Sequence, residues 1–181
     1  MPDLRDRLRP GADLRHMALH GCDLSGLDLR GANFEYADMR GVNLARASLE
    51  WCIFGKLNLA GANLSGARLS RARMSGVILT GAVLTGATLT GADLSWATID
   101  SAVLSGADLR RANLEGANLM YAKMVGANLA GADLSRTCLT GADLTNADVS
   151  GARLTYANLH DARTEGIRLV GATMPDGATH D

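Results

Sequence analysis

The sequence is poor in the residues on which ordinary globular cores and disulfide-stabilised folds depend. Only 4% of its 181 residues are aromatic, and it contains three Pro and three Cys. Because most cores gain much of their buried area from aromatic side chains, this core has to be filled by Leu and Ala. Cys22, Cys52 and Cys138 cannot all pair and form no CxxC motif, so a disulfide scaffold is not expected.

The chain also lacks the charge and the apolar segments that direct proteins to nucleic acids or membranes. Its formal net charge is −1, which makes no electrostatic case for either partner. The N-terminus shows no signal-peptide pattern, and no apolar run reaches the roughly 18 residues of a membrane span. We therefore expect a soluble, cytoplasmic protein that binds neither nucleic acid nor membrane.

Motifs of catalysis and metal binding are missing as well. None of the four His has a spacing to Cys, Asp or Glu that suggests a zinc site. The Gly residues are spaced five apart and form no phosphate-binding loop, and nothing resembles a nucleophile elbow or an HExxH motif. We expect a protein without enzymatic activity, with no catalytic residue, metal or cofactor.

A five-residue repeat dominates what is present. Gly81–Ser95 reads GAVLT GATLT GADLS, and the same register holds from Ala12 to Asp176 over 33 pentapeptides. We call the central residue of each repeat, usually Leu, the centre; it is apolar in 32 of 33 repeats, with Thr164 the exception. The residue two before it, the small position, is apolar in 32 of 33 repeats and is usually Ala. The residue between these two is the outward slot, and the residue two after the centre is the corner.

Two apolar positions separated by one polar residue are typical of a strand. A helix does not fit, because five residues turn it by about 500° and successive centres would leave no apolar stripe. Gly occupies 18 of the 33 corners, which predicts a positive φ there, as a type II turn requires. Three-residue strands joined by such turns predict a parallel β-solenoid.

The corners that are not Gly indicate how many repeats make one coil. Sorted by a period of 20 residues, they gather on one line, in which seven of nine positions are not Gly. This first corner line consists of His16, Tyr36, Lys56, Gly76, Trp96, Gly116, Arg136, Tyr156 and Asp176. The pattern predicts four pentapeptides per coil and a square cross-section.

Repeats such as ADLSG, ANLAG, ANLEG and ADLTN resemble the pentapeptide-repeat family, whose pattern is A-(D/N)-L-x-x. The resemblance covers residues 12–176. It implies an all-β fold, a right-handed quadrilateral parallel β-helix with four pentapeptides per coil. About eight coils at a spacing of ~4.8 Å give a rod roughly 40 Å long.

Both ends of the chain fall outside the repeat of residues 12–176. Residues 1–11 are predicted to form a short helical cap in which Leu4 and Leu8 face the first coil; the alternative is a frayed tail. Residues 177–181 are predicted to be a disordered tail. Since no amphipathic helix follows the repeat, we hypothesise that the C-terminal coils of two chains cover each other in a head-to-head homodimer.

Several residues are assigned to the inside of the solenoid or excluded from it by their place in the repeat. Phe34 and Phe54 occupy centres one coil apart on the same side, so their rings should stack. Cys22 and Cys52 occupy small positions and are predicted to be core residues. Cys138 lies in an outward slot and is the one thiol expected to be reactive.

Four residues of the first corner line are candidates for an interaction surface. Tyr36, Trp96, Arg136 and Tyr156 are of the types that are enriched at protein interfaces. The alternative is that these large side chains only shield corner backbone where Gly is absent.

A second candidate surface consists of apolar residues that point outward. Val83 and Val103 are 20 residues apart and should stack on one side, with Ile78 on the adjoining side; Met120 and Val125 are also outward. Such a patch is either a protein contact or the packing of β-branched residues on a strand surface.

The third candidate surface is acidic. No Asp or Glu occurs from residue 51 to residue 92, and acids outnumber bases from 93 to 150. A negatively charged surface in this later half would use Asp108, Asp133, Asp143 and Asp148. The alternative is a solvated face of the repeat.

Two functions remain in competition. Some members of the family that the chain resembles protect DNA gyrase and topoisomerase IV from antibiotics by imitating the width, length and negative charge of duplex DNA. The resemblance therefore implies a type II topoisomerase as one candidate partner. The net charge of −1 and the lack of interrupting loops and of a C-terminal helix depart from such members. The alternative is a non-enzymatic scaffold or structural rod with an unknown protein partner.

Overall fold

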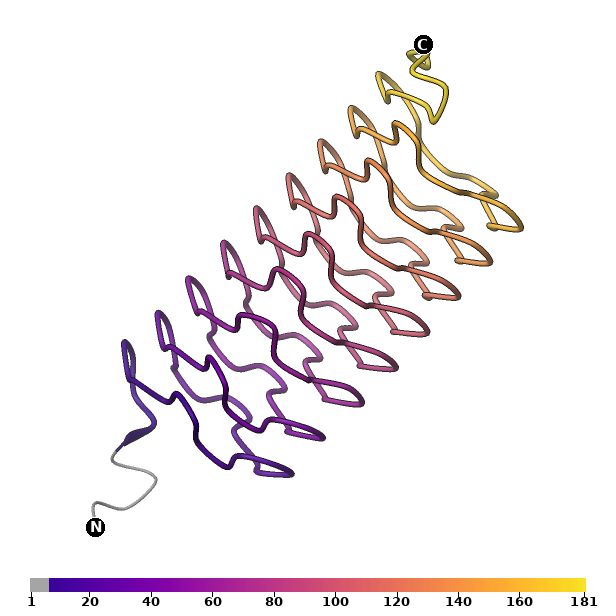
Figure 1. The fold of residues 1–181 in the computed structure, drawn as a ribbon. Helices are drawn as coiled ribbons and strands as arrows, with labels where there is room; N and C mark the ends of the chain where they lie inside the picture. The colour runs from indigo at the N-terminus through magenta and orange to yellow at the C-terminus, as the bar shows by residue number, and fades with distance from the viewer. Residues whose placement is uncertain (1–6) are drawn as a thin grey trace.

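A computed structural model describes residues 7–181, which form a rod of stacked coils (Figure 1). Parallel bridges join residues that are 20 apart, such as Asp13 with Asn33 and Val83 with Val103. Each coil therefore contains four pentapeptides, as predicted. Each strand is a single bridging residue in an outward slot. The bridging residues lie at 13 to 173 on side 1, 18 to 158 on side 2, 23 to 163 on side 3 and 28 to 168 on side 4.

Backbone hydrogen bonds explain why the coils must stack. The centre Leu14 donates its N–H to the carbonyl of Asn33 in the next coil at 2.8 Å, and Asn33 donates back to the carbonyl of Ala12 at 2.9 Å. Within one coil, the turn is closed by the N–H of Ala32, which donates to the carbonyl of Leu29 at 3.0 Å. Since most ladder partners lie in neighbouring coils, one coil alone would leave its backbone groups unpaired.

Corners adopt the left-handed conformation that the Gly pattern predicts. Gly86 has φ 64° and Gly91 has φ 65°, and among residues 7–181 thirteen residues other than Gly also have positive φ. Left-handed backbone costs a residue with a side chain about 1–2 kcal/mol relative to its right-handed conformation, whereas Gly is free of this strain. The non-Gly corners are therefore strained positions of the fold.

Two of the described corner residues, Lys56 and Asp176, lack the positive φ, and in each case a neighbouring Gly adopts it. Gly55, with φ 58°, takes the left-handed conformation in place of the corner residue Lys56. A Gly next to the corner absorbs the positive φ more easily than Lys does. Within residues 7–181, the ladder is interrupted beside this turn, because Asp38 and Asn58 form no bridge while their neighbours Asn43 and Asn63 do.

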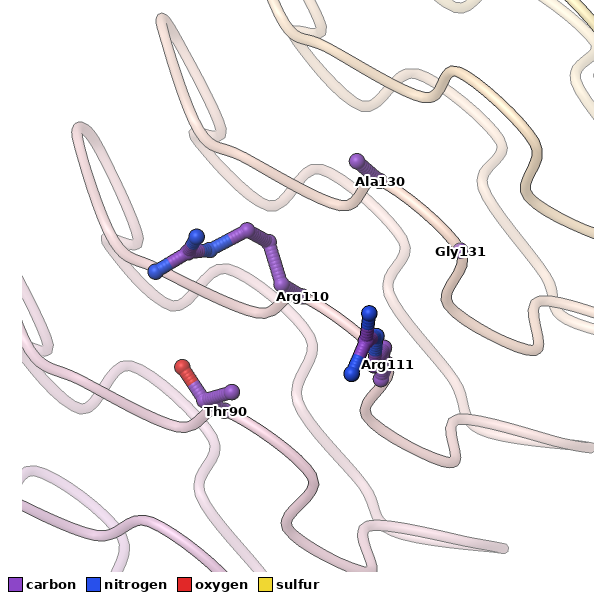
Figure 2. Close-up of a pocket in the computed structure, with 5 residues that line it drawn as sticks. All are labelled: Thr90, Arg110, Arg111, Ala130 and Gly131. Carbon is purple, nitrogen blue, oxygen red and sulfur yellow. The ribbon is translucent and has the colours of Figure 1, made fainter.

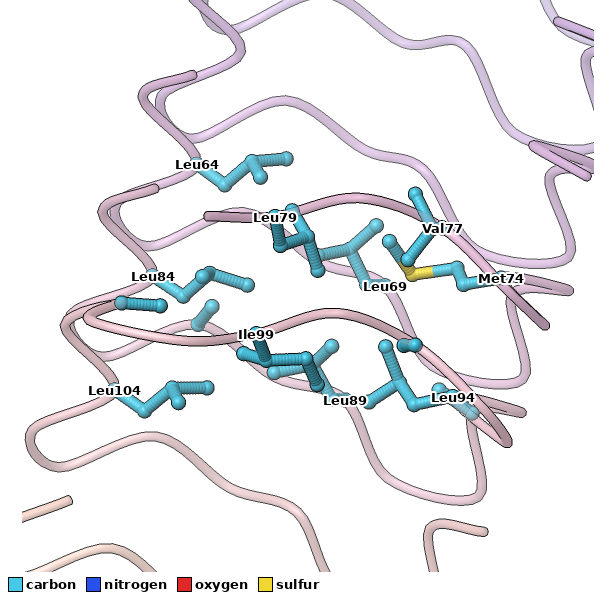
Figure 3. Close-up of a cluster of buried hydrophobic side chains, with 14 of the residues drawn as sticks. Leu64, Leu69, Met74, Val77, Leu79, Leu84, Leu89, Leu94, Ile99 and Leu104 are labelled. Carbon is cyan, nitrogen blue, oxygen red and sulfur yellow. The ribbon is translucent and has the colours of Figure 1, made fainter. Parts of the chain in front are cut away.

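The core is a set of Leu ladders along the axis of the rod. Leu64, Leu84 and Leu104 are fully buried centres that follow one another along one side (Figure 3). Phe34 and Phe54 stack as predicted, with ring centroids 5.3 Å apart and an interplanar angle of 15°. From Ala32 to Ala157, the Ala residues at the small positions are also buried and leave room for the Leu side chains.

The outward slots favour Asp and Asn for a structural reason. Asp23 accepts the backbone N–H of Ser25 at 3.1 Å through Oδ1, and Asn43 accepts that of Ala45 at 3.2 Å. A short side-chain oxygen that binds the N–H two residues ahead stabilises the start of a turn. Much of the acidic content of the chain is therefore part of the architecture.

The N-terminal cap falls only partly within the described residues. Arg7 is helical, and Leu8 is half-buried against the core of the first coils. Leu4, the other residue predicted to face the first coil, lies outside the described residues.

Residues 177–181 pair with the last coil, so the prediction of a disordered tail is wrong. Thr179 forms an antiparallel bridge with Thr173, and the N–H of Gly171 donates to the carbonyl of His180 at 2.7 Å. The reversal is possible because Gly177 adopts φ 88° and turns the chain back onto the last strand of side 1. The sequence pattern missed it because this strand is antiparallel and lies outside the repeat.

Candidate interaction surfaces

All Trp and Tyr residues of the chain lie at corners. Each has a positive φ, between 57° and 63°, and each is between 58% and 74% exposed. Both Phe residues, in contrast, are buried centres. Bulky residues in the left-handed conformation are rare, and such strain gathers at functional sites. These corner aromatics are Tyr36, Trp51, Trp96, Tyr121 and Tyr156.

The structure places the four candidates of the first corner line along one edge of the rod. Tyr36, Trp96 and Tyr156 follow one another at intervals of three coils, or about 14 Å. The ring of Tyr36 stacks on His16, with centroids 5.2 Å apart. The guanidinium of Arg136 lies 3.5 Å from a carboxylate oxygen of Glu115. The edge thus presents rings separated by polar groups.

Two aromatic corners on other lines were missed by the sequence analysis. The guanidinium of Arg71 lies 4.7 Å from the centre of a Trp51 ring, a cation–π contact. The ring of Tyr121 lies over Gly141. Both could have been found, because a Trp or Tyr in the corner position of any repeat has to point out of the rod.

The outward apolar residues form a small patch. Val83 and Val103 are bridged neighbours on side 3, as the sequence predicts, and both are half-buried. Ile78 lies on side 2 and is 36% exposed. Met120 and Val125 lie in turns of later coils. The core of the patch is therefore three side chains, two of them partly covered by neighbours.

The four acidic candidates do not form one surface. Asp108 and Asp148 lie on side 4, Asp133 lies on side 1 and Asp143 lies on side 3. Each is paired with an Arg, so the structure holds no continuous negative stripe along them. The shortest N–O distances are 2.7 Å for Asp108 with Arg110, 3.5 Å for Asp133 with Arg153, 3.7 Å for Asp143 with Arg163 and 3.6 Å for Asp148 with Arg168.

Local hydrogen bonds keep these carboxylates ionised. The hydroxyl of Thr145 donates to Asp143 at 2.6 Å and, with the backbone N–H of the same residue and the charge of Arg163, lowers the pKa of Asp143. The bidentate contact with Arg110 lowers the pKa of Asp108 in the same way. At neutral pH the charges are present but are balanced within the rod.

A shallow groove of about 430 Å³ lies on the corner between sides 4 and 1 (Figure 2). Its lining includes Thr90, Arg110 and Arg111. Arg110 is held by two hydrogen bonds to Asp108, at 2.9 and 2.7 Å. Arg111 extends along the corner of Gly131. One uncommitted guanidinium in an open groove is a weak basis for binding an anion.

The described residues hold no group of three or more His, Cys, Asp or Glu that could bind a metal ion. Burial raises the pKa of the Cys52 thiol to about 12, and its Sγ donates to the carbonyl of Leu29. Cys22 is half-buried against the core, and Cys138 is half-buried in its outward slot. In residues 7–181, no helix has the length and apolar character needed to cross a membrane.

The C-terminal end of the axis is open on the sides that the tail does not cover. A hollow of about 260 Å³ lies there, lined mainly by apolar residues of the last coils. The lining residues are Leu154, Leu159, Ala162, Thr164, Ile167, Leu169 and Met174. This hollow is where a head-to-head dimer would bury apolar surface.

A coil of four pentapeptides, with a Leu and Ala interior and turns at every fifth residue, defines a pentapeptide β-solenoid. The chain belongs to the pentapeptide-repeat family, whose model of pentapeptide repeats matches it in overlapping segments between residues 11 and 169. The family membership and the repeat solenoid expected from the sequence are thus confirmed.

Solved structures of the same family resemble the chain over most of its length. HetL, a pentapeptide repeat protein involved in heterocyst differentiation regulation from the cyanobacterium Nostoc sp. strain PCC 7120, is 28% identical, with a TM-score of 0.68 and coverage of 93% of each chain. A trypsin-treated variant of QnrB1, a plasmid-mediated fluoroquinolone resistance protein, is 24% identical, with a TM-score of 0.70 and coverage of 89% of this chain and 85% of QnrB1. The likeness to QnrB1 is one of fold. The curated proteins contain no match.

Proposed function

We propose that the chain is a non-enzymatic rod that binds protein partners through the Tyr and Trp side chains at its corners. The observation that carries this proposal is that every Tyr and Trp occupies a left-handed corner and remains more than half exposed. Tyr and Trp are the residues that most often dominate the binding energy of protein interfaces.

Energetics favour binding over mere shielding of the backbone. An aromatic ring that is 74% exposed, as in Tyr36 and Tyr156, gains little from burial within its own chain. The left-handed backbone costs about 1–2 kcal/mol that Gly at the same position would avoid. A ring kept at this position therefore contributes little to folding, and its exposed area is available to a partner.

A type II topoisomerase remains the more specific candidate partner. QnrB1 is described as a fluoroquinolone resistance protein, and the rod has a comparable fold. Imitation of duplex DNA needs dense negative charge along the rod. Here Asp108, Asp133, Asp143 and Asp148 are spread over three sides and paired with Arg. The charge pattern therefore favours a scaffold that recognises its partner through aromatic corners.

Self-association through the C-terminal coil also stays a prediction. The apolar hollow between Leu154 and Met174 supports it, because two such ends would cover each other. A chain that stays monomeric by light scattering at micromolar concentration would contradict it.

Site-specific photo-crosslinking tests the proposed function. A benzophenone amino acid replaces Trp51 or Tyr121, and matched controls carry it at the outward slots Asn118 or Asn128. In cells that express the protein, we expect adducts with the same partner from the corner positions and none from the controls. The proposal would be contradicted if only the outward-slot variants formed adducts, or if no variant formed an adduct with another protein.

A further inference from the structure

Between Tyr36 and Tyr156, the first corner line has the same order of residue classes in both directions from Trp96. Tyr36 and Tyr156 lie three coils before and after Trp96. Between them, Gly76 corresponds to Gly116 and Lys56 corresponds to Arg136. The order is His16, Tyr36, Lys56, Gly76, Trp96, Gly116, Arg136, Tyr156 and Asp176. We propose that this edge binds a second copy of the chain side by side and antiparallel, with Trp96 of both copies at the two-fold axis. This proposal rests on the proposed function, since it assigns a partner to one of the aromatic edges.

A two-fold interface requires a surface that is complementary to itself. When the two rods are antiparallel and Trp96 faces Trp96, Tyr36 of each copy faces Tyr156 of the other. The same register sets Gly76 opposite Gly116 and Lys56 opposite Arg136, and these two cations need a carboxylate beside them. At the two ends, His16 faces Asp176.

The direction in which Trp96 leans favours the antiparallel arrangement. Its ring lies over Gly116, with Cε3 and Cζ3 2.5 Å from the point that a Cβ on Gly116 would occupy. In a parallel pair, both rings would compete for the same space. In an antiparallel pair, each ring lies over its own Gly116 and therefore opposite Gly76 of the other copy.

In this arrangement, each Trp96 ring would contact Lys56 of the other copy. The stem of Lys56 lies over Gly76, with Cγ 3.2 Å from the point that a Cβ on Gly76 would occupy. The indole face of one copy would thus lie against the Lys56 side chain of the other, in a cation–π contact that the symmetry repeats.

The interrupted ladder supplies a hollow for the next contact. A groove of about 390 Å³ beside Tyr36 is lined by Glu35, Gly55, Lys56 and Ser75. In the antiparallel pair this groove faces Arg136 of the second copy. The carboxylate of Glu35 offers Arg136 the opposite charge, while the Lys56 stem of the same groove extends away over Gly76.

The size of the contact predicts a weak dimer. Six Tyr and Trp side chains, each more than half exposed in the single rod, would be covered, which is roughly 600–1,000 Å². With Lys56 and Arg136 the interface reaches the lower end of the range for specific complexes, about 1,200 Å². We therefore expect dissociation in the micromolar range.

Cross-linking tests the arrangement directly. In a background of Cys22→Ala, Cys52→Ala and Cys138→Asn, single variants Tyr36→Cys and Tyr156→Cys are treated with a short bis-maleimide. We expect covalent dimers in an equimolar mixture of the two variants and none from either variant alone. No dimer in the mixture overturns the proposal. Self-linking of both variants would show a parallel pair, and self-linking of Tyr156→Cys without any Tyr36→Cys/Tyr156→Cys mixed dimer would show the end-to-end dimer only; either result overturns the proposal.

Sedimentation equilibrium provides a second measurement, in which no cysteine is introduced into the first corner line. Trp96→Ser should weaken the dimer at least tenfold, while Tyr121→Ser, an aromatic corner on another line, should leave it unchanged. Equal effects of the two variants would overturn the proposal. The photo-crosslinking from Trp51 and Tyr121 can succeed or fail independently, so the loss of this dimer is distinguishable from the loss of the proposed function.

Discussion

The ring of Trp96 lies over the corner of Gly116, one coil further along the rod. Other long corner side chains follow the same rule, because Lys56 lies over Gly76 and Tyr121 over Gly141. Gly at these corners therefore serves twice: it adopts positive φ without strain, and it leaves space for the side chain of the preceding coil.

Replacing these Gly residues should separate the two roles. Gly106 has φ 64° with open space around a Cβ, whereas a Cβ on Gly116 would collide with the Trp96 ring. We expect Gly106→Ala to cost about 1 kcal/mol from the backbone alone. Gly116→Ala should cost about 2–4 kcal/mol because overpacking is added. Urea unfolding measures both.

A second substitution provides the control for that comparison. In a Trp96→Ala background, Gly116→Ala should cost no more than Gly106→Ala does. If Gly116→Ala and Gly106→Ala have equal effects in the wild-type background, the ring does not occupy the corner in solution.

The Leu ladder should be most sensitive in the middle of the rod. Leu89 is fully buried, and its replacement by Ala is expected to lower the free energy of unfolding by about 2–5 kcal/mol through loss of burial and formation of a cavity. Leu159, half-buried at the C-terminal end, is the matched control. Its replacement by Ala should cost clearly less, as measured by thermal or urea unfolding. Equal costs of Leu89→Ala and Leu159→Ala would show that the C-terminal end of the core is not open.

The pH dependence near Asp38 follows from its contact with Arg40. Two hydrogen bonds from the guanidinium, at 2.9 and 2.7 Å, lower the pKa of Asp38 to about 2. Because the folded pKa lies below the unfolded one, the stabilisation is present above about pH 4 and is lost as the pH falls towards 2. Arg40→Ala should raise the pKa of Asp38 towards its ordinary value in an NMR titration. Asp28, held by Arg30, should titrate as before.

Charge balance predicts the behaviour of the chain towards topoisomerases. With Asp133 and Asp143 paired to Arg in the next coil, the rod lacks the charge density of duplex DNA. We expect no inhibition of gyrase supercoiling at micromolar concentration, and no protection against a gyrase poison. Inhibition that disappears in an Asp143→Asn variant would instead support DNA mimicry.

The sequence alone predicts the repeat, the coil and the exposed corners because all three follow from a strict local period. The ion pair of Asp143 with Arg163 was also within reach, since the two residues are one coil apart. The displaced turn at Gly55 was not predicted, because it depends on a competition between two adjacent residues for one left-handed position. The return of Thr179 onto Thr173 depends on a free strand edge created only by the folded rod.

The central claim is that the corner aromatics are kept for contacts with other chains and not for folding. The free energy of unfolding of Tyr156→Gly tests it most directly, because this ring is 74% exposed at φ 62°. We predict a value within about 0.5 kcal/mol of the wild type, since relief of strain offsets the small loss of burial, and a value about 1 kcal/mol lower for Tyr156→Ala, which keeps the strain. A loss of about 2 kcal/mol or more in Tyr156→Gly would show that the ring serves the fold, and would contradict the account.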